Sequence, residues 1–288
     1  MKTTAIEKCI IRLAGDSGDG MQITGDRLAL ISALFGNDVV TLADYPAEIR
    51  APQGTTYGVS GYQMQIGKVK VHTPGDKVDI LVAMNPAALV VNIDRVKDGG
   101  IVIVNENSFD KKNLERAKLE SDPLDDPSME KYDVHKINMT DRTLECLQES
   151  SLSNVDKSRC KNFFALGCIS WLLTRPIDTT EAWLKEKFAK KPEIADANIK
   201  ALKEGYVAAD TLGLVAFPYS IEKQSDTEKG RYRFVSGNQA IALGLCAAGV
   251  KSELGVFYSS YPITPASDIL HEMAKLREIG RASCRERV

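Results

Sequence analysis

The chain has 288 residues, of which 43% are apolar and 26% charged, with a formal net charge of −2. These values exclude a largely disordered chain and give no basic bias that would indicate nucleic acid. Met1–Lys8 lacks the apolar core of a signal peptide, and the longest apolar stretch, Ile80–Ile93, is too short to span a membrane. We therefore expect a cytoplasmic protein with no nucleic-acid partner and no membrane partner.

The first predicted elements form a strand–loop–helix–strand unit. Cys9–Ala14 is a short apolar run, and it ends in the glycine loop Gly15–Gly20. Met21–Phe35 carries apolar residues at helical spacing, and Val39–Ala43 is a second apolar run. This order predicts a right-handed βαβ unit with parallel strands.

Further strands and helices predict an α/β fold with a mostly parallel sheet and helices on both faces. Tyr62–His72 alternates apolar and polar residues around Gly67, which indicates a β-hairpin. Pro86–Val96 is a predicted helix capped by Asn85 and ended by Gly99-Gly100. The other predicted strands are Ile80–Met84, Ile101–Asn105 and Tyr132–Asn138. The other predicted helices are Lys161–Leu173, Thr180–Lys190 and Pro192–Thr211. The charged segment Lys111–Glu130 is predicted to be an exposed excursion.

A change of composition near Ala216–Tyr232 indicates a linker. After it, Gly237–Val250 predicts a helix of small residues, Val256–Tyr258 a short strand, and Ala266–Lys275 another helix. These elements cover too little chain for an independent core. We therefore expect the start of a second domain that this sequence does not complete.

The final segment, Glu278–Val288, reads EIGRASCRERV and has no apolar periodicity. Its back-translation resembles a common short-read sequencing adapter. We expect that this tail is not biological and that the natural coding sequence continues. A natural, frayed C-terminus is the alternative.

The glycine loop reads G-x-x-G-x-G between a strand and a helix. Backbone N–H groups at a helix N-terminus suit anions, and glycine permits their close approach. Asp16 and Asp19 would repel a phosphate unless something compensates them. The alternative is a tight turn that packs helix on sheet. A Mg²⁺ motif of thiamine enzymes is rejected, because Asn37 is too close to Gly18-Asp19-Gly20.

A polar loop, Asp44–Thr55, follows the strand Val39–Ala43, at the end of a strand where ligand crevices form in α/β sheets. It holds Glu48 and Arg50, which are either binding residues or a surface ion pair. The histidines, His72, His135 and His271, show no metal-ligand spacing.

The six cysteines form no C-x-x-C pair, so we expect neither a structural zinc nor an iron–sulfur cluster on this chain. Any iron–sulfur centre would lie on a partner chain. The cysteines are Cys9, Cys146, Cys160, Cys168, Cys246 and Cys284.

A set of motifs, taken in order, resembles one enzyme family. The motifs are GDSGDGMQITGDRLA, YPAEIRAPQGTTYG, NFFALG (Asn162–Gly167), GNQAIALGLCAAGV (Gly237–Val250) and YPITPASDIL (Tyr261–Leu270). Together they resemble the α subunit of 2-oxoacid:ferredoxin oxidoreductases, in the form with a γ domain fused ahead of it. The 2-oxoglutarate branch is the most similar, and the resemblance extends to about Arg277.

The resemblance implies an organisation and an activity. Residues 1–213 would be a γ-type domain, 214–235 a linker, 236–277 an incomplete pyrimidine-binding domain and 278–288 the non-native tail. Such enzymes convert a 2-oxoacid and coenzyme A into an acyl-CoA and CO₂, and pass electrons to ferredoxin. Thiamine diphosphate would be shared with a β subunit, which would hold Mg²⁺, and this chain would be inactive alone.

The resemblance also implies site residues. Tyr261, Pro262, Thr264 and Pro265 would face the active site, with the Thr264 hydroxyl near the 2-oxoacid and the prolines holding the loop rigid. Thr264 is alternatively, or additionally, a helix N-cap. The cofactor-binding candidates on the coenzyme A side are Gly15, Ser17, Gly18, Gly20, Glu48 and Arg50, and no residue is a metal candidate.

Two alternatives remain open from the sequence. The substrate could be pyruvate or a branched-chain 2-oxoacid, because the residue that would pair with the second carboxylate of 2-oxoglutarate is not identified here. A different class of protein is a nucleotide- or anion-binding assembly module without catalysis, which the glycine loop alone would support.

Overall fold

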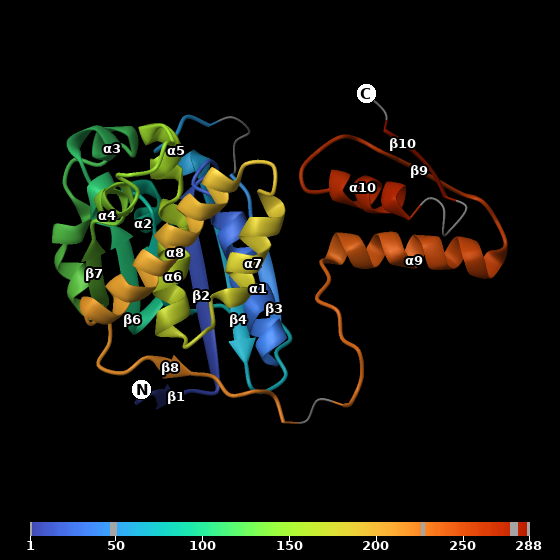
Figure 1. Ribbon diagram of the computed structural model, residues 1–288, viewed down its shortest axis with the longest axis horizontal. Coiled ribbons are helices and arrows are strands. Elements are labelled where there is room, and N and C mark those ends of the chain that lie inside the picture. Colours follow the sequence, from blue (N-terminus) through green and yellow to red (C-terminus); the bar gives the residue numbers. More distant parts are fainter. Residues whose placement is uncertain (1, 47–50, 226–227, 277–281, 287–288) are drawn as a thin grey trace. The chain divides into compact units, whose positions relative to one another are not determined.

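The computed structural model describes residues 2–46, 51–225, 228–276 and 282–286 (Figure 1). The chain divides into two compact units, Met1–Thr227 and Glu228–Val288, and each is described by itself. The predicted boundaries at residues 213 and 235 remain predictions. Within the described ranges, no helix is long and apolar enough to cross a membrane.

The described part of the first unit is built on a six-stranded sheet with the strand order β3-β4-β2-β5-β6-β7. β2, β5, β6 and β7 are mutually parallel, whereas β4 runs antiparallel to both of its neighbours. The mostly parallel sheet that the sequence predicts is therefore confirmed. The strands are β2 (Lys8–Asp16), β3 (Asp38–Asp44), β4 (Val59–Gly67), β5 (Val78–Ala83), β6 (Val96–Asn105) and β7 (Asp133–Ile137).

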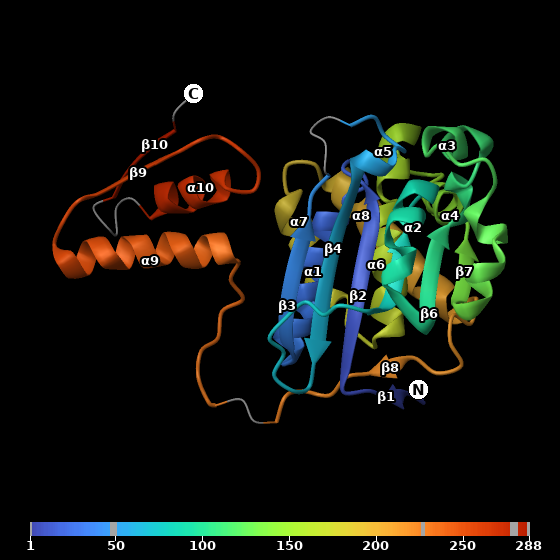
Figure 2. The same ribbon diagram turned by 180° about the vertical axis from the view of Figure 1, so that it is seen from behind.

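Helices cover both faces of this sheet (Figures 1 and 2). The larger core lies on one face and includes buried residues of α1, α6 and α8, while the smaller core lies under α2 on the other face. The helices of the unit are α1 (Met21–Phe35), α2 (Pro86–Asn92), α3 (Lys111–Arg116), α4 (Met139–Cys146), α5 (Asn154–Arg159), α6 (Lys161–Leu172), α7 (Asp178–Lys187) and α8 (Pro192–Thr211).

The predicted βαβ unit is present, with one difference. β3 runs in the same direction as β2, because both are antiparallel to β4. The two strands are not neighbours, however, since β4 lies between them. The predicted hairpin at Tyr62–His72 is wrong, because β4 is a single strand that ends at Gly67. The side-chain amide of Gln63 in β4 donates a hydrogen bond to the carbonyl of Pro74 at 3.1 Å. The chain after Gly67 therefore folds back onto β4 instead of pairing beside it.

The segment from Asn85 to Asn105 shows how local signals fix a helix start better than its end. The Asn85 side chain accepts a hydrogen bond from Ala88 N at 2.8 Å, as the predicted cap requires. The helix ends at Asn92, and β6 already begins at Val96. Gly99-Gly100 therefore lies inside a strand and does not end the helix as predicted.

The predicted excursion Lys111–Glu130 is only partly exposed. It contains α3, and it buries Leu124 and Met129 in the smaller core. Two short helices, α4 and α5, follow β7 and were not predicted.

Two glycines set the approach of α6 and α8. A Cβ added at Gly167 would lie 2.1 Å from the carbonyl oxygen of Leu202, and one added at Gly205 would lie 1.9 Å from that of Phe164. Only glycine permits the two backbones to come this close. The predicted motif NFFALG thus has a structural role at its glycine.

The second unit contains α9 (Gly237–Ser252), β9 (Val256–Ser260), α10 (Ser267–Lys275) and β10 (Ala282–Glu286). Ser236 and Gln239 cap α9 reciprocally, as a capping box. β10 pairs with β9 in parallel. The small core includes Ala242, Cys246 and Met273. β10 falls within the predicted tail, whose non-native origin remains a prediction.

Candidate functional site

The glycine loop Gly15–Gly20 joins the carboxyl end of β2 to the start of α1. Gly15 is buried, while Ser17 and Gly18 are exposed. Gly20 precedes α1 with a φ of 73°, a conformation that glycine adopts readily, and no side chain caps the helix. Within the described residues, the backbone N–H groups of the first helical turn therefore have no side-chain cap and stand next to an exposed loop, which suits a polar or anionic ligand group.

The two aspartates of this loop are occupied by contacts within the protein. Asp19 Oδ2 accepts a hydrogen bond from the backbone N–H of Asp16 at 2.9 Å, and Asp19 Oδ1 lies 3.0 Å from Lys161 Nζ. The carboxylate of Asp16 accepts from the backbone N–H of Gly54 at 3.1 and 3.0 Å. The aspartates therefore fix the shape of the loop, and Lys161 balances one of their two charges.

Burial raises the pKa of Asp16 above its ordinary value, although the Gly54 N–H group stabilises the carboxylate. The charge of Asp19 raises this pKa further, while Asn85 and Lys161 lower it. Asp16 therefore pays a desolvation penalty that its hydrogen bonds only partly offset.

The amino end of α6 packs against the glycine loop. A Cβ added at Gly20 would lie 2.4 Å from Asn162 Nδ2, so the loop backbone approaches this side chain closely. Lys161 of the same turn reaches Asp19. Sequence reasoning missed both contacts, because Asn162 was recognised only within a family motif and no spacing rule connects α6 with the loop.

Glu48 and Arg50 lie outside the described residues, so the structure does not place these two candidates. The described end of the same polar loop does reach the glycine loop. Besides the Gly54–Asp16 contact, a Cβ added at Gly18 would lie 3.3 Å from Gln53 Nε2. The two segments predicted for the coenzyme A side are therefore brought together at the carboxyl edge of the sheet.

Tyr261–Pro265 forms an exposed loop between β9 and α10 in the second unit. Tyr261 is 74% exposed and Thr264 is also exposed. Asn238 of α9 donates from Nδ2 to the carbonyl of Pro265 at 2.9 Å, which ties the loop to the start of α9. The N-cap of α10 is Ala266, without a side-chain cap bond, so the alternative N-cap role of Thr264 is wrong.

Metal-binding and thiol groups contribute little to this site. Within the described residues, no three His, Cys, Asp or Glu side chains lie close enough together to hold a metal ion. Burial raises the pKa of Cys160 and of Cys168 to about 12, and that of Cys146 to about 11. Because the thiolate is the reactive form, a raised pKa makes these three cysteines less reactive at neutral pH than an ordinary thiol.

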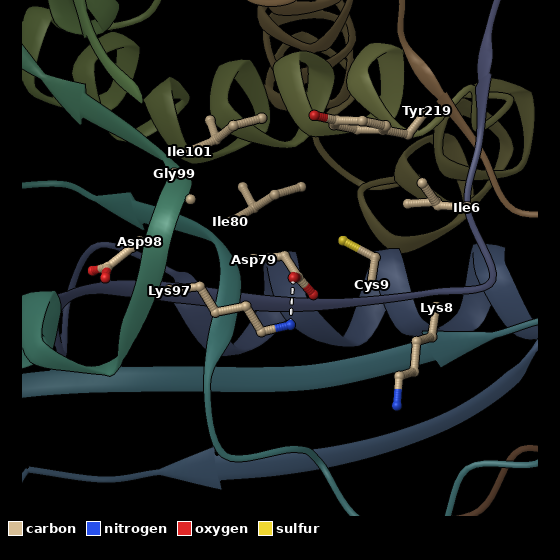
Figure 3. Close-up of a pocket in the computed structure, with 11 residues that line it drawn as sticks. Ile6, Lys8, Cys9, Asp79, Ile80, Lys97, Asp98, Gly99, Ile101 and Tyr219 are labelled. Carbon is tan, nitrogen blue, oxygen red and sulfur yellow. Dashed lines mark hydrogen bonds and ion pairs between the residues drawn. The ribbon is translucent and has the colours of Figure 1, made fainter. Parts of the chain in front are cut away.

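A pocket of about 250 Å³ lies at the opposite, amino end of the parallel strands (Figure 3). Cys9, Ile80 and Ile101 form its apolar part, below the ring of Tyr219. Asp79 on its rim already accepts from Ile10 N at 2.7 Å and from Lys97 Nζ at 2.6 Å. The carboxylate of Asp79 is therefore occupied by contacts within the protein, while Lys8 and Asp98 also line the pocket.

Two relatives are similar to this chain in sequence. It is 49% identical over 270 residues to the 2-oxoglutarate oxidoreductase subunit KorA of Mycobacterium tuberculosis, covering 94% of this chain and 41% of the relative. It is 20% identical over 304 residues to subunit alpha of 2-oxoacid:ferredoxin oxidoreductase 1 of Aeropyrum pernix, covering 95% of this chain and 45% of the relative. The chain thus spans less than half the length of these relatives.

A solved structure supports the same relationship. The 2-oxoglutarate:ferredoxin oxidoreductase of Magnetococcus marinus, solved with 2-oxoglutarate, coenzyme A and succinyl-CoA bound, matches with a TM-score of 0.72 and 27% identity, over 98% of this chain and 43% of that chain. The profile of the family described as pyruvate ferredoxin/flavodoxin oxidoreductase matches residues 10–208. The resemblance predicted from the motifs is therefore confirmed, and the chain belongs to the pyruvate ferredoxin/flavodoxin oxidoreductase family.

Proposed function

We propose that this chain is part of the α subunit, with a fused γ domain, of a 2-oxoacid:ferredoxin oxidoreductase. The complete enzyme would convert 2-oxoglutarate and coenzyme A into succinyl-CoA and CO₂, with electrons passing to ferredoxin. The observation that carries the proposal is the similarity to the KorA subunit along nearly the whole chain. Pyruvate and branched-chain substrates are the less favoured alternatives.

The Tyr261–Pro265 loop would face the active site and lie beside thiamine diphosphate. Its exposed Thr264 hydroxyl can donate a hydrogen bond to the oxo group of the substrate, which is where negative charge develops. The two prolines restrict the backbone, and the Asn238 contact fixes the loop at one end. Thiamine diphosphate, when bound, supplies a stabilised carbanion centre for decarboxylation. The residues of this loop offer the cofactor a hydroxyl and an apolar surface. Mg²⁺ would be held by the β subunit.

The glycine loop would form the coenzyme A side, with Ser17, Gly18 and Gly20 offering backbone groups to the ligand, while the buried Gly15, which pairs with Ser60 of β4, would support the turn. The proposal is supported by the N–H groups without a side-chain cap at the start of α1 and by the exposure of Ser17 and Gly18. Glu48 and Arg50 belong to the same proposal by their place in the adjoining loop.

The partners implied are a β subunit of the same enzyme, which completes the thiamine diphosphate site, and ferredoxin as electron acceptor. The iron–sulfur cluster would lie on the partner chain. We place the enzyme in the cytoplasm, and expect no turnover by this chain alone.

The test uses the full-length subunit produced together with its β partner. We expect 2-oxoglutarate to drive viologen reduction that depends on coenzyme A. Thr264→Val keeps the size of the side chain but removes the hydroxyl, and should lower kcat/KM by about tenfold or more. Thr211→Val is the matched control, because Thr211 Oγ1 donates to Val207 O within α8, its only partner among the residues described.

Three results separate the possibilities. Activity with pyruvate but not 2-oxoglutarate would replace the substrate and keep the enzyme class. No activity with any 2-oxoacid would refute the catalytic proposal. Equal effects of the two threonine substitutions would refute the role of Thr264.

A further inference from the structure

Arg175, just after α6, is buried, and no ion pair with it is found among the described residues. Its side chain is 1% exposed, and its guanidinium stacks over the ring of Phe35 at 4.3 Å. Within the described residues, its Nε and Nη1 have no hydrogen-bond partner. Burial lowers the pKa of Arg175 to about 10. A charge held in this way is costly, so its one polar contact needs an explanation.

That contact is with Asn37, at the carboxyl end of α1. Arg175 Nη2 donates to Asn37 Oδ1. The other half of the same amide, Asn37 Nδ2, donates to the carbonyl of Glu222 at 2.6 Å. Because Arg175 can only donate, it orients the amide so that the NH₂ group must point toward Glu222. The two bonds form a relay from the buried cation to the backbone of the segment that leads out of the first unit.

Further contacts hold that segment along its length. Tyr219–Ser220 (β8) pairs in parallel with Thr4–Ala5 (β1). Thr174 Oγ1 donates to the carbonyl of Tyr219 at 3.0 Å, and Gln224 N donates to the carbonyl of Gly36 at 2.9 Å. Ile221, between these contacts, is 0% exposed. The ring of Tyr219 also lines the pocket of Figure 3.

We propose that residues 218–224 form an anchored strap and that Arg175, acting through Asn37, is the positioning residue that holds its end. The chain then leaves the first unit from a fixed point at Gln224. Although residues 216–232 read as a linker from their composition, the part up to residue 224 belongs to the first unit. This inference does not depend on the proposed activity, because it concerns the exit of the chain and not the reaction.

Trypsin provides a direct test in the intact chain. Lys223 lies in the strap, while Lys229, Arg231 and Arg233 lie beyond it, and all four side chains are exposed. Cleavage needs local unfolding of the backbone, so the strap should slow cleavage at Lys223 only. We expect the initial rate at Lys223 to be well below the rates at the three later sites, as read by mass spectrometry.

Two substitutions break the relay in different ways. Asn37→Asp gives Arg175 a carboxylate but removes the donor to Glu222 O. Arg175→Met removes the buried charge and keeps an unbranched side chain over Phe35, so global stability should stay the same or rise. Each substitution should raise the rate of trypsin cleavage at Lys223, relative to the rate at Lys229, by about fivefold, which is the effect of losing one hydrogen bond. Hydrogen exchange at Gln224 N should accelerate as well, while exchange in β5 should not.

Asn198→Ala is the matched control, because within the described part of the chain this buried asparagine of α8 donates only to Ile194 O. It should leave the Lys223 ratio unchanged. Faster exchange in β5 together with the strap would show a general structural role and overturn the proposal. An unchanged ratio in both relay variants would overturn it too.

Discussion

Gly205→Ala provides a quantitative test of the α6–α8 crossing that supports the glycine loop. The new Cβ would lie 1.9 Å from the carbonyl oxygen of Phe164, where at least 3.0 Å is needed, so the two backbones must part by 1.1 Å. Backbone atoms cannot rotate away as a side chain would. Overpacking of this kind costs about 3 kcal/mol, and the gain in helix propensity returns about 1 kcal/mol.

The expected net loss is thus about 2 kcal/mol, which lowers the melting temperature of a unit this size by roughly 4–8 °C. Calorimetry of the wild-type chain and the variant measures it. Gly244→Ala in α9 is the matched control, since a Cβ there meets nothing within 4 Å and should leave stability equal or higher. A Gly205→Ala chain that melts within about 1 °C of wild type would refute the close crossing.

Two further substitutions test the candidate site, and one reaction tests the burial of two cysteines outside it. Because burial raises the folded-state pKa of Asp16, the wild-type chain loses stability as pH rises from the ordinary pKa of aspartate, about 3.9, through the raised pKa. Asp16→Asn removes this loss, so the urea midpoint of the variant should improve relative to wild type over that rise in pH, and a constant difference would contradict the raised pKa. Lys161→Met leaves the charge of Asp19 uncompensated, so it should raise the KM for coenzyme A in the complete enzyme several-fold and change the KM for 2-oxoglutarate little. The control Lys203→Met breaks the ion pair with Glu181 and should change neither KM. Cys146 should be alkylated before the buried Cys160, and the opposite order in a peptide map would contradict their burial.

Helices with local start signals could be predicted from the sequence to within a few residues. The predicted helix Met21–Phe35 matches α1, and Pro192–Thr211 matches α8. Glycines with positive φ bound α1 at both ends, at Gly20 and Gly36. Such signals act between residues close in sequence, and a single sequence therefore shows them. α4 and α5, with 8 and 6 residues, are too short to show a helical period.

Strand order could not be predicted in the same way. The alternation in Tyr62–His72 correctly indicates a strand, but it does not tell which strand is its partner. β4 pairs with β2 on one side and β3 on the other, and both partners precede it in the chain. The pairing depends on which buried faces fit together across the whole sheet, because period-two alternation fixes the face of a strand and not its neighbour.

The candidate site shows the same division between local and distant information. The glycine loop was predicted as a strand-to-helix turn from its composition, and its residues lie there. Its partners Lys161 and Asn162 come from α6 and carry no local signal that points to the loop. The exposed Tyr261–Pro265 loop was identified through a family motif, and its tie to Asn238 emerges only from the structure.

The glycine loop is compatible with a ligand site although it holds two carboxylates, because these carboxylates already bind groups of the protein. A carboxylate repels an anion most when its oxygens face the ligand, but the oxygens of Asp16 and Asp19 bind N–H groups of the protein or Lys161. The N–H groups at the start of α1 remain free of a side-chain cap. Since one negative charge is still unbalanced, the loop would suit a neutral polar ligand group better than a phosphate. The loop can therefore be both a braced turn and a binding surface, the two alternatives that the sequence left open.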